Sequence, residues 1–344
     1  MKQPVRVPGD VLAERLSAAL RDAGASADSA ASTVRALMHA SSLGVDSHGA
    51  RLVEHYCTVL GSGRINRSPQ LRVDRRGAAA AVVDGDDGLG HHAAYRAMAE
   101  AVGLARDAGI GAVGVVRSSH FGAAGAYARA GGEAGMVAFA TTNADRLVAL
   151  HGGAAPFHGT NPLAFGAPSG GERPWLLDMA TSSIPFNRVF LYRSLGLTLP
   201  EGVAAAATGV PTRDPRAVGM LLPLGGADFG FKGAALAGVA TLFSAVLQGA
   251  ALDHEMIRMV GGDDMTTPRG MGHFVMAIDP AFFGGAAVFA EGMRRYLAAL
   301  RAAPARPGEA VMAPGDREWR VEAERARDGI PLDPDTAAFL GLAR

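Results

Sequence analysis

The chain has 344 residues, of which 33 are basic and 33 acidic, so its formal net charge is zero, and 49% of its residues are hydrophobic. A balanced charge argues against a nucleic-acid-binding protein, which needs surplus Lys and Arg to neutralise phosphates. The single cysteine, Cys57, excludes a disulfide scaffold, and no apolar run approaches the ~18 residues of a membrane span. Because the start also lacks the apolar core of a signal peptide, we expect a cytoplasmic protein of about two domains.

The first 60 residues are predicted to be helical. Apolar residues recur with helical spacing over 10–24 and again over 26–38, and a third helix is expected to end near Gly61. Gly44 interrupts this region, so the Ser47–Gly49 segment is expected at or near a helix N-terminus, where backbone N–H groups are free.

The middle of the chain alternates apolar runs with a helical stretch. A helix is predicted from Gly90 to Gly109. The predicted strands are AAAVVDG, IGAVGVV, MVAFATTN, NPLAFGAPS and PWLLDMATS. This alternation predicts an α/β sheet, although periodicity alone does not distinguish parallel from antiparallel pairing.

Further elements are predicted towards the C-terminus. Residues 196–226 are rich in Gly, Pro and Ala and are expected to be irregular. The apolar segment 233–249 predicts a buried helix, too short and too rich in Ala and Gly to cross a membrane. FVMAID predicts one more strand, 286–302 another helix, and the charged segment 318–328 helical turns.

One glycine-rich segment matches a nucleotide-binding fingerprint. Gly88–Ala93 fits G-x-G-x-x-A between a predicted strand and a predicted helix, where a Rossmann loop cradles a pyrophosphate. The next strand runs into Arg117–His120, however, without the acidic residue expected to contact the ribose. Because the chain has 46 glycines, chance matches are common, and the fingerprint alone does not establish a dinucleotide site.

Histidines in predicted loops are the first candidates for proton transfer. His48 lies in DSHG and His120 in SSHFG, after a predicted strand, and imidazole is the usual proton donor or acceptor at neutral pH. His151, His158 and His273 are weaker candidates, and each of the five can equally be a surface, capping or core residue. A metal site is the rival use, but no H-E-x-x-H, H-x-H or Cys cluster occurs, and we predict none.

Three other segments combine polar side chains with turns. They are Gly159–Phe165, Leu177–Ser183 and Gly230–Gly233, which can aim backbone amides, a carboxylate and an ammonium at a ligand. Each also has an ordinary explanation as a strand-entry turn, a helix N-cap or a solvated lysine. Lys232 stands out because Lys2 is the only other lysine, and Arg does not replace a compact ammonium.

Taken in order, these segments resemble the malate/L-lactate dehydrogenase family, which includes ureidoglycolate dehydrogenase, sulfolactate dehydrogenase, diketogulonate reductase and Δ1-piperideine-2-carboxylate reductase. The matching stretches are GVDSHGARLVEHY, GIGAVGVVRSSHFGAAGAYA, HGGAAPFHGTNPLAFGAPS, LLDMATSS, GVPTRDP, GFKGAALAGVATLFSAVLQGA, GHFVMAIDP and APGDRE. The resemblance implies the family's own non-Rossmann α/β fold, with a mostly antiparallel sheet domain and helical domains. Gly88–Ala93 is then not a Rossmann loop.

The resemblance also implies a domain division and an assembly. Residues 1–75 plus 286–344 are expected to form a helical domain joining both termini. Residues 76–200 plus 265–285 are expected to form the sheet domain that binds the cofactor, and 201–264 a small helical excursion. Members of the family are typically homodimers with the active site close to the subunit interface.

The implied activity is hydride transfer between NAD or NADP and a small 2-hydroxy or 2-keto acid of the malate, lactate or ureidoglycolate type. The alternative is reduction of a cyclic 2-imino acid, Δ1-piperideine-2-carboxylate or Δ1-pyrroline-2-carboxylate. Two rivals belong to other classes: a metal-dependent hydrolase using His48, His120 and His151, and a non-catalytic relative that keeps the fold and binds cofactor. The partners expected are a small-molecule substrate and a second copy of the chain, with no nucleic acid and no membrane.

The resemblance assigns roles to particular residues. His48 and His120 match the two histidines proposed as acid or base in different members, and Asp178 matches the acid that orients or charges the histidine. The residues expected to line the cofactor are Asn143, Thr160, Asn161, Pro162, Asp178, Met179, Ala180, Thr181, Ser182, Ser183, Phe231, Lys232, Gly315, Asp316 and Arg317.

Three departures from the family pattern concern the substrate. Many members have an Arg where this chain has Leu52, with Arg51 one step earlier, about 100° round a helix. Asn187-Arg188 replaces a Gly-Lys pair, and Ala144–Arg146 replaces apolar or Pro-rich residues. Either Arg51 or Arg146 is therefore expected to clamp the substrate carboxylate. The residues expected to contact the substrate are Ser47, Arg51, Arg146 and Thr160.

Overall fold

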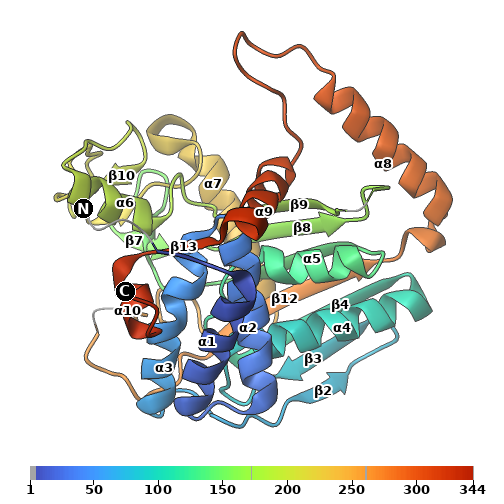
Figure 1. Cartoon of the computed structure of the whole chain (residues 1–344), viewed down its shortest axis with the longest axis horizontal. Helices are drawn as coiled ribbons and strands as arrows, with labels where there is room; N and C mark the ends of the chain where they lie inside the picture. Colours follow the sequence, from blue (N-terminus) through green and yellow to red (C-terminus); the bar gives the residue numbers. More distant parts are fainter. Residues whose placement is uncertain (1–4, 172, 260–261, 344) are drawn as a thin grey trace.

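A computed structural model describes residues 5–171, 173–259 and 262–343, and a seven-stranded sheet forms its centre (Figure 1). The strand order is β2-β3-β4-β12-β5-β8-β9. The strands are β2 (Arg72–Arg75), β3 (Ala80–Asp84), β4 (Ile110–Ser118), β12 (Met271–Ile278), β5 (Val137–Thr142), β8 (Leu163–Ala167) and β9 (Trp175–Met179). Every neighbouring pair is antiparallel except β3 and β4, so the predicted mostly antiparallel sheet is confirmed.

Helices cover both faces of this sheet. Helices α4 (Gly90–Ala108) and α5 (Gly125–Glu133) pack on one face, and α7 (Gly226–Thr241), continued by a π-helix over Leu242–Val246, lies on the other. The alternation of strand side chains explains the two layers. Ala138 and Ala140 of β5 belong to the core under α4 and α5, while Phe139 between them packs with Ala240 of α7.

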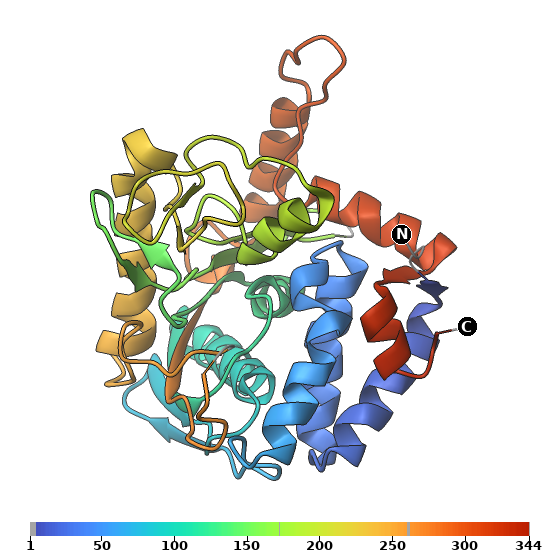
Figure 2. The same ribbon diagram turned by 90° about the vertical axis from the view of Figure 1, so that its left-hand side faces the viewer.

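The N-terminal helices and the C-terminal segment form a second core. They are α1 (Gly9–Asp22), α2 (Ala27–Ser42), α3 (Val53–Gly61) and α10 (Pro334–Phe339), together with the paired strands β1 (Val5–Val7) and β13 (Ile330–Leu332). The pairing brings the two ends of the chain side by side (Figure 2). Leu12, Leu16 and Leu20 of α1, spaced one helical turn apart, are fully buried here.

A four-stranded sheet stands beside the main one. Its strands are β10 (Ala204–Ala205), β11 (Met220–Leu221), β6 (Val148–Ala149) and β7 (Pro156–His158), and α6 (Phe186–Leu195) packs nearby through the same apolar cluster. The expectation that 196–226 is irregular was therefore wrong at β10 and β11. Strands of two residues leave no periodicity to detect, because their pairing is decided by β6 in another part of the chain.

The glycine-rich segment before α4 is not a phosphate loop. Gly90 N donates to Ser119 Oγ (3.1 Å), which in turn donates to Gly88 O (2.9 Å), so a side chain caps the helix N-terminus. A Cβ on Gly90 would lie 2.1 Å from Ser119 O, and the residue must be glycine because two backbones meet there. The non-Rossmann expectation is confirmed.

Helices α8 (Ala286–Arg301) and α9 (Asp316–Asp328) complete the described fold, and the apolar helix α7 differs from expectation. Helix α8 stands away from the body, and a loop leads from it to α9 (Figure 1). The apolar helix predicted as buried over 233–249 begins at Gly226, and only a third of it is buried. Gly226–Val246 is also the one helix in the described ranges that is long and apolar enough to cross a membrane. Apolar content predicted the helix but could not show what covers it.

Candidate active site

His48 lies in a connection made of two short helical turns. It ends the 3₁₀ helix Asp46–His48, and a second 3₁₀ helix, Ala50–Leu52, leads directly into α3. The segment is therefore close to an α-helix N-terminus, as expected, but the helix itself begins five residues after His48.

Ser41, near the end of α2, holds this connection in place. Ala50 N donates to Ser41 Oγ (2.8 Å), and a Cβ on Gly49 would lie 2.4 Å from the same oxygen, so glycine is required between them. Ser47 Oγ lies 2.9 Å from His48 Nδ1 and fixes one side of the imidazole ring. The Ser-His-Gly sequence thus shapes the backbone and orients the histidine.

The two predicted histidines lie next to each other. The ring centroids of His48 and His120 are 6.0 Å apart with the planes 21° from parallel. Tyr56 of α3, which sequence reasoning missed, brings its hydroxyl oxygen 2.7 Å from His120 Nδ1. Its ring is perpendicular to that of His91, with the ring centroids 4.7 Å apart. A tyrosine on the buried face of an amphipathic helix looks like a core residue, so no sequence signal marked it.

Burial sets the protonation of this group. Desolvation lowers the pKa of His48, and desolvation together with the charges of His48 and Arg269 places the pKa of His120 well below its ordinary value. Both rings are neutral at pH 7 and can accept a proton. Desolvation raises the pKa of Tyr56, so its hydroxyl keeps its proton.

Asp178 lies at the end of β9 and faces the start of α5. Its Oδ2 accepts a hydrogen bond from Gly125 N (2.9 Å), and a Cβ on Gly125 would lie 2.7 Å from that oxygen. Although its side chain is accessible to solvent, the surrounding protein desolvates it and raises its pKa to about 6, against the lowering effect of the Gly125 bond. Asp178 is hydrogen-bonded to Gly125 and to neither His48 nor His120.

Several residues predicted to line the cofactor use their side chains for hydrogen bonds to the protein backbone. Thr181 Oγ1 donates to Thr160 O and Asn161 O (both 3.1 Å), Ser182 Oγ to Ile184 O (2.9 Å), and Ser183 Oγ to Pro223 O (2.7 Å). These bonds connect the segment after β9 to the turn before β8 and to the chain entering α7.

A buried cluster around Asp253, also absent from the sequence predictions, joins two of the predicted residues. Asp253 carboxylate oxygens accept from His158 (3.0 Å), Asn161 (2.7 Å), Gly159 N (3.1 Å) and Asn143 (3.1 Å). Although desolvation acts to raise it, these hydrogen bonds hold the pKa of Asp253 below its ordinary value. The Asp253 cluster uses the amide group of Asn161 completely, since its Oδ1 accepts from Ala144 N (3.1 Å).

Two predicted cofactor residues keep free polar groups. Asn143 is fully buried, and its Oδ1 has no hydrogen-bond partner among the residues the structure describes, which is rare for a buried acceptor. Lys232 is exposed on α7, with its ammonium 5.5 Å from the Phe229 ring and 5.9 Å from the Phe231 ring, and pairs with no carboxylate in the described part of the chain. An unsatisfied acceptor and a free ammonium fit the amide and phosphate groups of a nicotinamide dinucleotide.

The predicted segment before α9 lies beside the strand that carries Asp178. Leu176 N donates to Pro314 O (3.4 Å), and Gly315 begins the turn with a φ of 96°. Asp316 is occupied by a two-point ion pair with Arg301 (2.9 and 2.6 Å), whereas Arg317 is mostly exposed.

The two arginines predicted to clamp the substrate are both exposed. Arg51 and Arg146 form no ion pair within the described ranges, so each keeps its guanidinium free. A different arginine, Arg269, is buried and paired with Asp145, and its charge reaches His120. Nothing in the sequence distinguished Arg269 from the other arginines.

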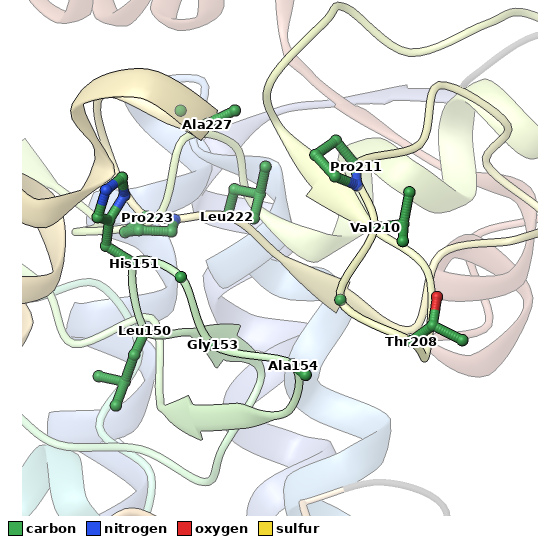
Figure 3. Close-up of a pocket in the computed structure, with 13 residues that line it drawn as sticks. Leu150, His151, Gly153, Ala154, Thr208, Val210, Pro211, Leu222, Pro223 and Ala227 are labelled. Atoms are coloured by element: carbon green, nitrogen blue, oxygen red, sulfur yellow. The ribbon is translucent and has the colours of Figure 1, made fainter.

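A cavity of about 380 Å³ borders these segments (Figure 3). His151, Pro223 and Ala227 lie on one side, and Thr208, Val210 and Pro211 on the other. It adjoins the predicted cofactor segment, since Pro223 O accepts from Ser183. His151 therefore lies in this cavity, against the Phe231 ring (5.7 Å), rather than with the stacked histidines. Within the described ranges, no three His, Cys, Asp or Glu side chains are placed to hold a metal ion.

Comparison with known proteins places these features in a family. The sequence profile described as malate/L-lactate dehydrogenase matches residues 7–340. The ureidoglycolate dehydrogenase (NAD(+)) of Escherichia coli K12 is 31% identical over 98% of this chain and 95% of its own. The (2R)-3-sulfolactate dehydrogenase (NADP(+)) of Chromohalobacter salexigens is 35% identical over 90% of this chain and 89% of its own.

Solved structures agree. The malate dehydrogenase of Entamoeba histolytica has a TM-score of 0.91 at 29% identity, covering 98% of this chain and 97% of its own. The Δ1-piperideine-2-carboxylate reductase of Pseudomonas syringae has a TM-score of 0.87 at 29% identity, covering 98% and 100%. By these comparisons the protein is an NAD(P)-dependent oxidoreductase. The chain belongs to the malate/L-lactate dehydrogenase family.

Proposed function

We propose that this protein transfers hydride between NAD or NADP and a small 2-hydroxy or 2-keto acid of the malate, lactate or ureidoglycolate type. The observation that carries the proposal is the stacked pair of neutral histidines, His48 and His120, with Tyr56 bound to one of them. When bound, the nicotinamide would accept or deliver the hydride. The protein's own residues must then move a proton at the substrate oxygen.

His120 and His48 are the proposed proton carriers. In the direction of hydroxy-acid oxidation, a neutral imidazole accepts the hydroxyl proton, and lowered pKa values keep both rings neutral at pH 7. If His120 Nδ1–H donates to the Tyr56 oxygen, His120 Nε2 is left as the acceptor. Ser47 orients His48 in the same way. Asp178, at the end of β9, supplies a carboxyl group whose pKa of about 6 suits exchange of a proton near neutral pH.

Cofactor and substrate contacts follow from the groups left free. We assign Asn143 Oδ1 and the Lys232 ammonium to the cofactor, together with the segments Met179–Ala180 and Gly315–Arg317. The scaffold side chains of Thr181–Ser183 would shape this site through the backbone. Arg51 or Arg146 would hold the substrate carboxylate, because both are free cations.

A second candidate function is reduction of a cyclic 2-imino acid. The observation that favours it is the likeness, over their full lengths, to the Δ1-piperideine-2-carboxylate reductase of Pseudomonas syringae. The experiment that tests both follows the absorbance of NADH and NADPH, in parallel, against keto acids and cyclic imino acids. Oxidation with keto acids supports the first function and identifies the cofactor, and oxidation only with cyclic imines replaces it by the second. Cofactor binding without turnover across the panel would contradict both.

The assembly and location are proposed on similar grounds. Val239 of α7 and Leu242 and Val246 of the π-helix that continues it, spaced by three and four residues, form an exposed apolar stripe. Phe283 and Val288 are exposed near the start of α8. A second copy of the chain would cover such surfaces in a homodimer. Light scattering after gel filtration tests this, and Leu242→Glu with Val246→Glu should give a monomer. We further propose a cytoplasmic enzyme without membrane or nucleic-acid partner.

The domain division is proposed as well. The pairing of β1 with β13 and their shared core with α1, α2, α3 and α10 support a helical domain made from 1–75 and 286–344. Limited proteolysis tests it, since cleavage should fall first in the connections between the proposed parts.

A further inference from the structure

A second cavity, of about 240 Å³, lies where α2, α4, α5 and α9 meet. None of its lining residues is among those proposed for catalysis, substrate or cofactor. It is smaller than the roughly 300–1,000 Å³ typical of pockets for drug-sized ligands. A ligand of a few heavy atoms fits this space, and a dinucleotide does not.

The charges around this cavity leave one cation unpaired. Glu133 and Glu322 both line it, and Arg129 binds them at 2.7 and 3.0 Å. Arg173 adds a further ion pair with Glu322 at 2.7 Å. Arg35, in contrast, pairs with no carboxylate in the described part of the chain. Its guanidinium carbon lies 4.2 Å from the centroid of the Tyr95 ring.

Contact with an aromatic ring occupies one face of the Arg35 guanidinium. The N–H groups at its edge remain available to a planar acceptor, and two of them can donate in parallel to the two oxygens of a carboxylate.

A buried imidazole next to Arg35 also lacks a partner. His39 follows Arg35 by one helical turn on α2, so the two side chains lie on the same face. The residue is 8% exposed, lines the cavity and makes no side-chain hydrogen bond within the described residues. Burial, and then the charges of Arg129 and Arg35, lower the pKa of His39 to about 3. The neutral ring carries one N–H donor and one acceptor nitrogen, and the tautomer with the N–H towards the cavity would donate to an anion there.

We propose that this cavity is a second ligand site, which binds a small carboxylate anion between the Arg35 guanidinium and the His39 imidazole. The anion would neutralise the unpaired charge and satisfy the buried ring at the same time. Such binding requires neither cofactor nor turnover, so it does not depend on the proposed function.

The test observes His39 directly. Full-length protein labelled with ¹³C at the histidine ring carbon Cε1 is titrated with sodium acetate, sodium malonate or sodium phosphate, and with sodium chloride at matched ionic strength. Loss of one signal in His39→Gln assigns the resonance. Reading this resonance alone separates the cavity from anion binding near His48 and His120. We expect the His39 signal to move in a saturable manner with acetate or malonate and not with chloride.

Two variants complete the test. Arg35→Gln, at an exposed position that should not disturb folding, is expected to weaken binding at least about tenfold, because a charge-assisted bond is lost. Arg96→Gln is the matched control, since Arg96 follows Tyr95 on α4 but pairs with Glu100 (3.2 Å) outside the cavity. A response that never saturates, equals that of chloride, appears only with phosphate, or is unchanged in Arg35→Gln overturns the proposal.

Discussion

Two polar clusters lie inside this fold, and they differ in how fully they use their hydrogen-bonding groups. In the Asp253 cluster one carboxylate accepts from a histidine, two asparagine amides, a threonine hydroxyl and a backbone amide, although Asn143 Oδ1 keeps no partner within the described residues. Within the same residues, the His48–His120 pair is hydrogen-bonded from one side only, by Ser47 and Tyr56. A satisfied network fixes geometry, whereas a group with a free nitrogen can exchange a proton. The comparison assigns stability to the first cluster and chemistry to the second.

The largest effect is expected from breaking the Asp253 cluster. Asp253→Ala takes one acceptor away from each of His158, Asn161 and Asn143, which are all buried. We expect the free energy of unfolding to fall by about 3–5 kcal/mol, because each buried donor left without a partner costs about 1–3 kcal/mol. Urea denaturation measures this loss.

Should Asp253→Ala fail to fold, Asp253→Asn keeps the shape and one acceptor oxygen and should lose less. A loss below about 0.5 kcal/mol in both variants would contradict the stabilising role of the cluster, because ordinary surface substitutions produce changes of that size.

The next effect concerns the histidine pair. If both histidines carry the proton, His120→Ala and His48→Ala should each lower kcat at least about a hundredfold. If a single histidine carries it, only the variant of that histidine should show this loss. Unfolding free energies should change far less than in Asp253→Ala. His92→Ala is a matched control, since the partly exposed His92 ring on α4 bonds only Ser32 (3.1 Å) within the described residues. Full activity in both variants would remove the histidines from the mechanism.

A third prediction concerns His273, which lies between the clusters. His273 is fully buried, with Nδ1 2.6 Å from Thr142 Oγ1 and Nε2 2.8 Å from Ser118 Oγ. Burial lowers its pKa from 6.5 to about 3, so the unfolded chain binds a proton that the folded protein does not. Stability therefore falls as pH drops below 6.5. Between pH 6.5 and 5.0 the loss from this residue should be about 1.6 kcal/mol.

Urea denaturation at the two pH values measures the loss from His273. In His273→Gln, which removes the titrating ring, the difference between the two pH values should shrink by a similar amount. An unchanged difference would show that the ring is protonated in the folded state or does not govern acid stability.

Local patterns and the family resemblance predicted the scaffold better than the contacts between distant parts. The runs that became β3, β4, β5, β8, β9 and β12 are short, apolar and bounded by turns, which is the signal a buried strand leaves. His48 and His120 could be singled out because glycines and serines flank them in loops. The mostly antiparallel sheet followed from the resemblance, since periodicity does not reveal pairing direction.

The missed features depend on partners far away in the sequence. Strands β1 and β13 have three residues each, and only their pairing across the whole chain defines them. Tyr56 has the spacing of a core residue, and its role appears only when His120 lies beside its hydroxyl. Asp253 lies in a segment without regular structure, and five groups from three other regions of the described chain converge on it. The exposed face of α7 was missed because composition does not say whether a helix is covered by its own chain.

The smallest effect is expected from removing the Tyr56 hydroxyl, which bonds the proposed proton carrier His120. Tyr56→Phe removes a hydrogen bond to His120 and leaves the ring packed against His91 (4.7 Å), so stability should change little. We expect kcat to fall about tenfold, the equivalent of about 1.4 kcal/mol. Because Tyr56 fixes the ring nitrogen that exchanges the proton, the acidic limb of the profile of kcat/KM against pH should also move.

Phe121→Leu is a packing control for this prediction, since Phe121 stacks on His273 (4.5 Å) without bonding His120. It should leave the pH profile in place even if it lowers stability. If Tyr56→Phe changes stability but neither kcat nor the pH profile, the role of Tyr56 is structural, like that of Asp253. Its hydrogen bond to His120 would then not contribute to proton transfer, and Ser47–His48 would be the one remaining hydrogen-bonded pair assigned to catalysis.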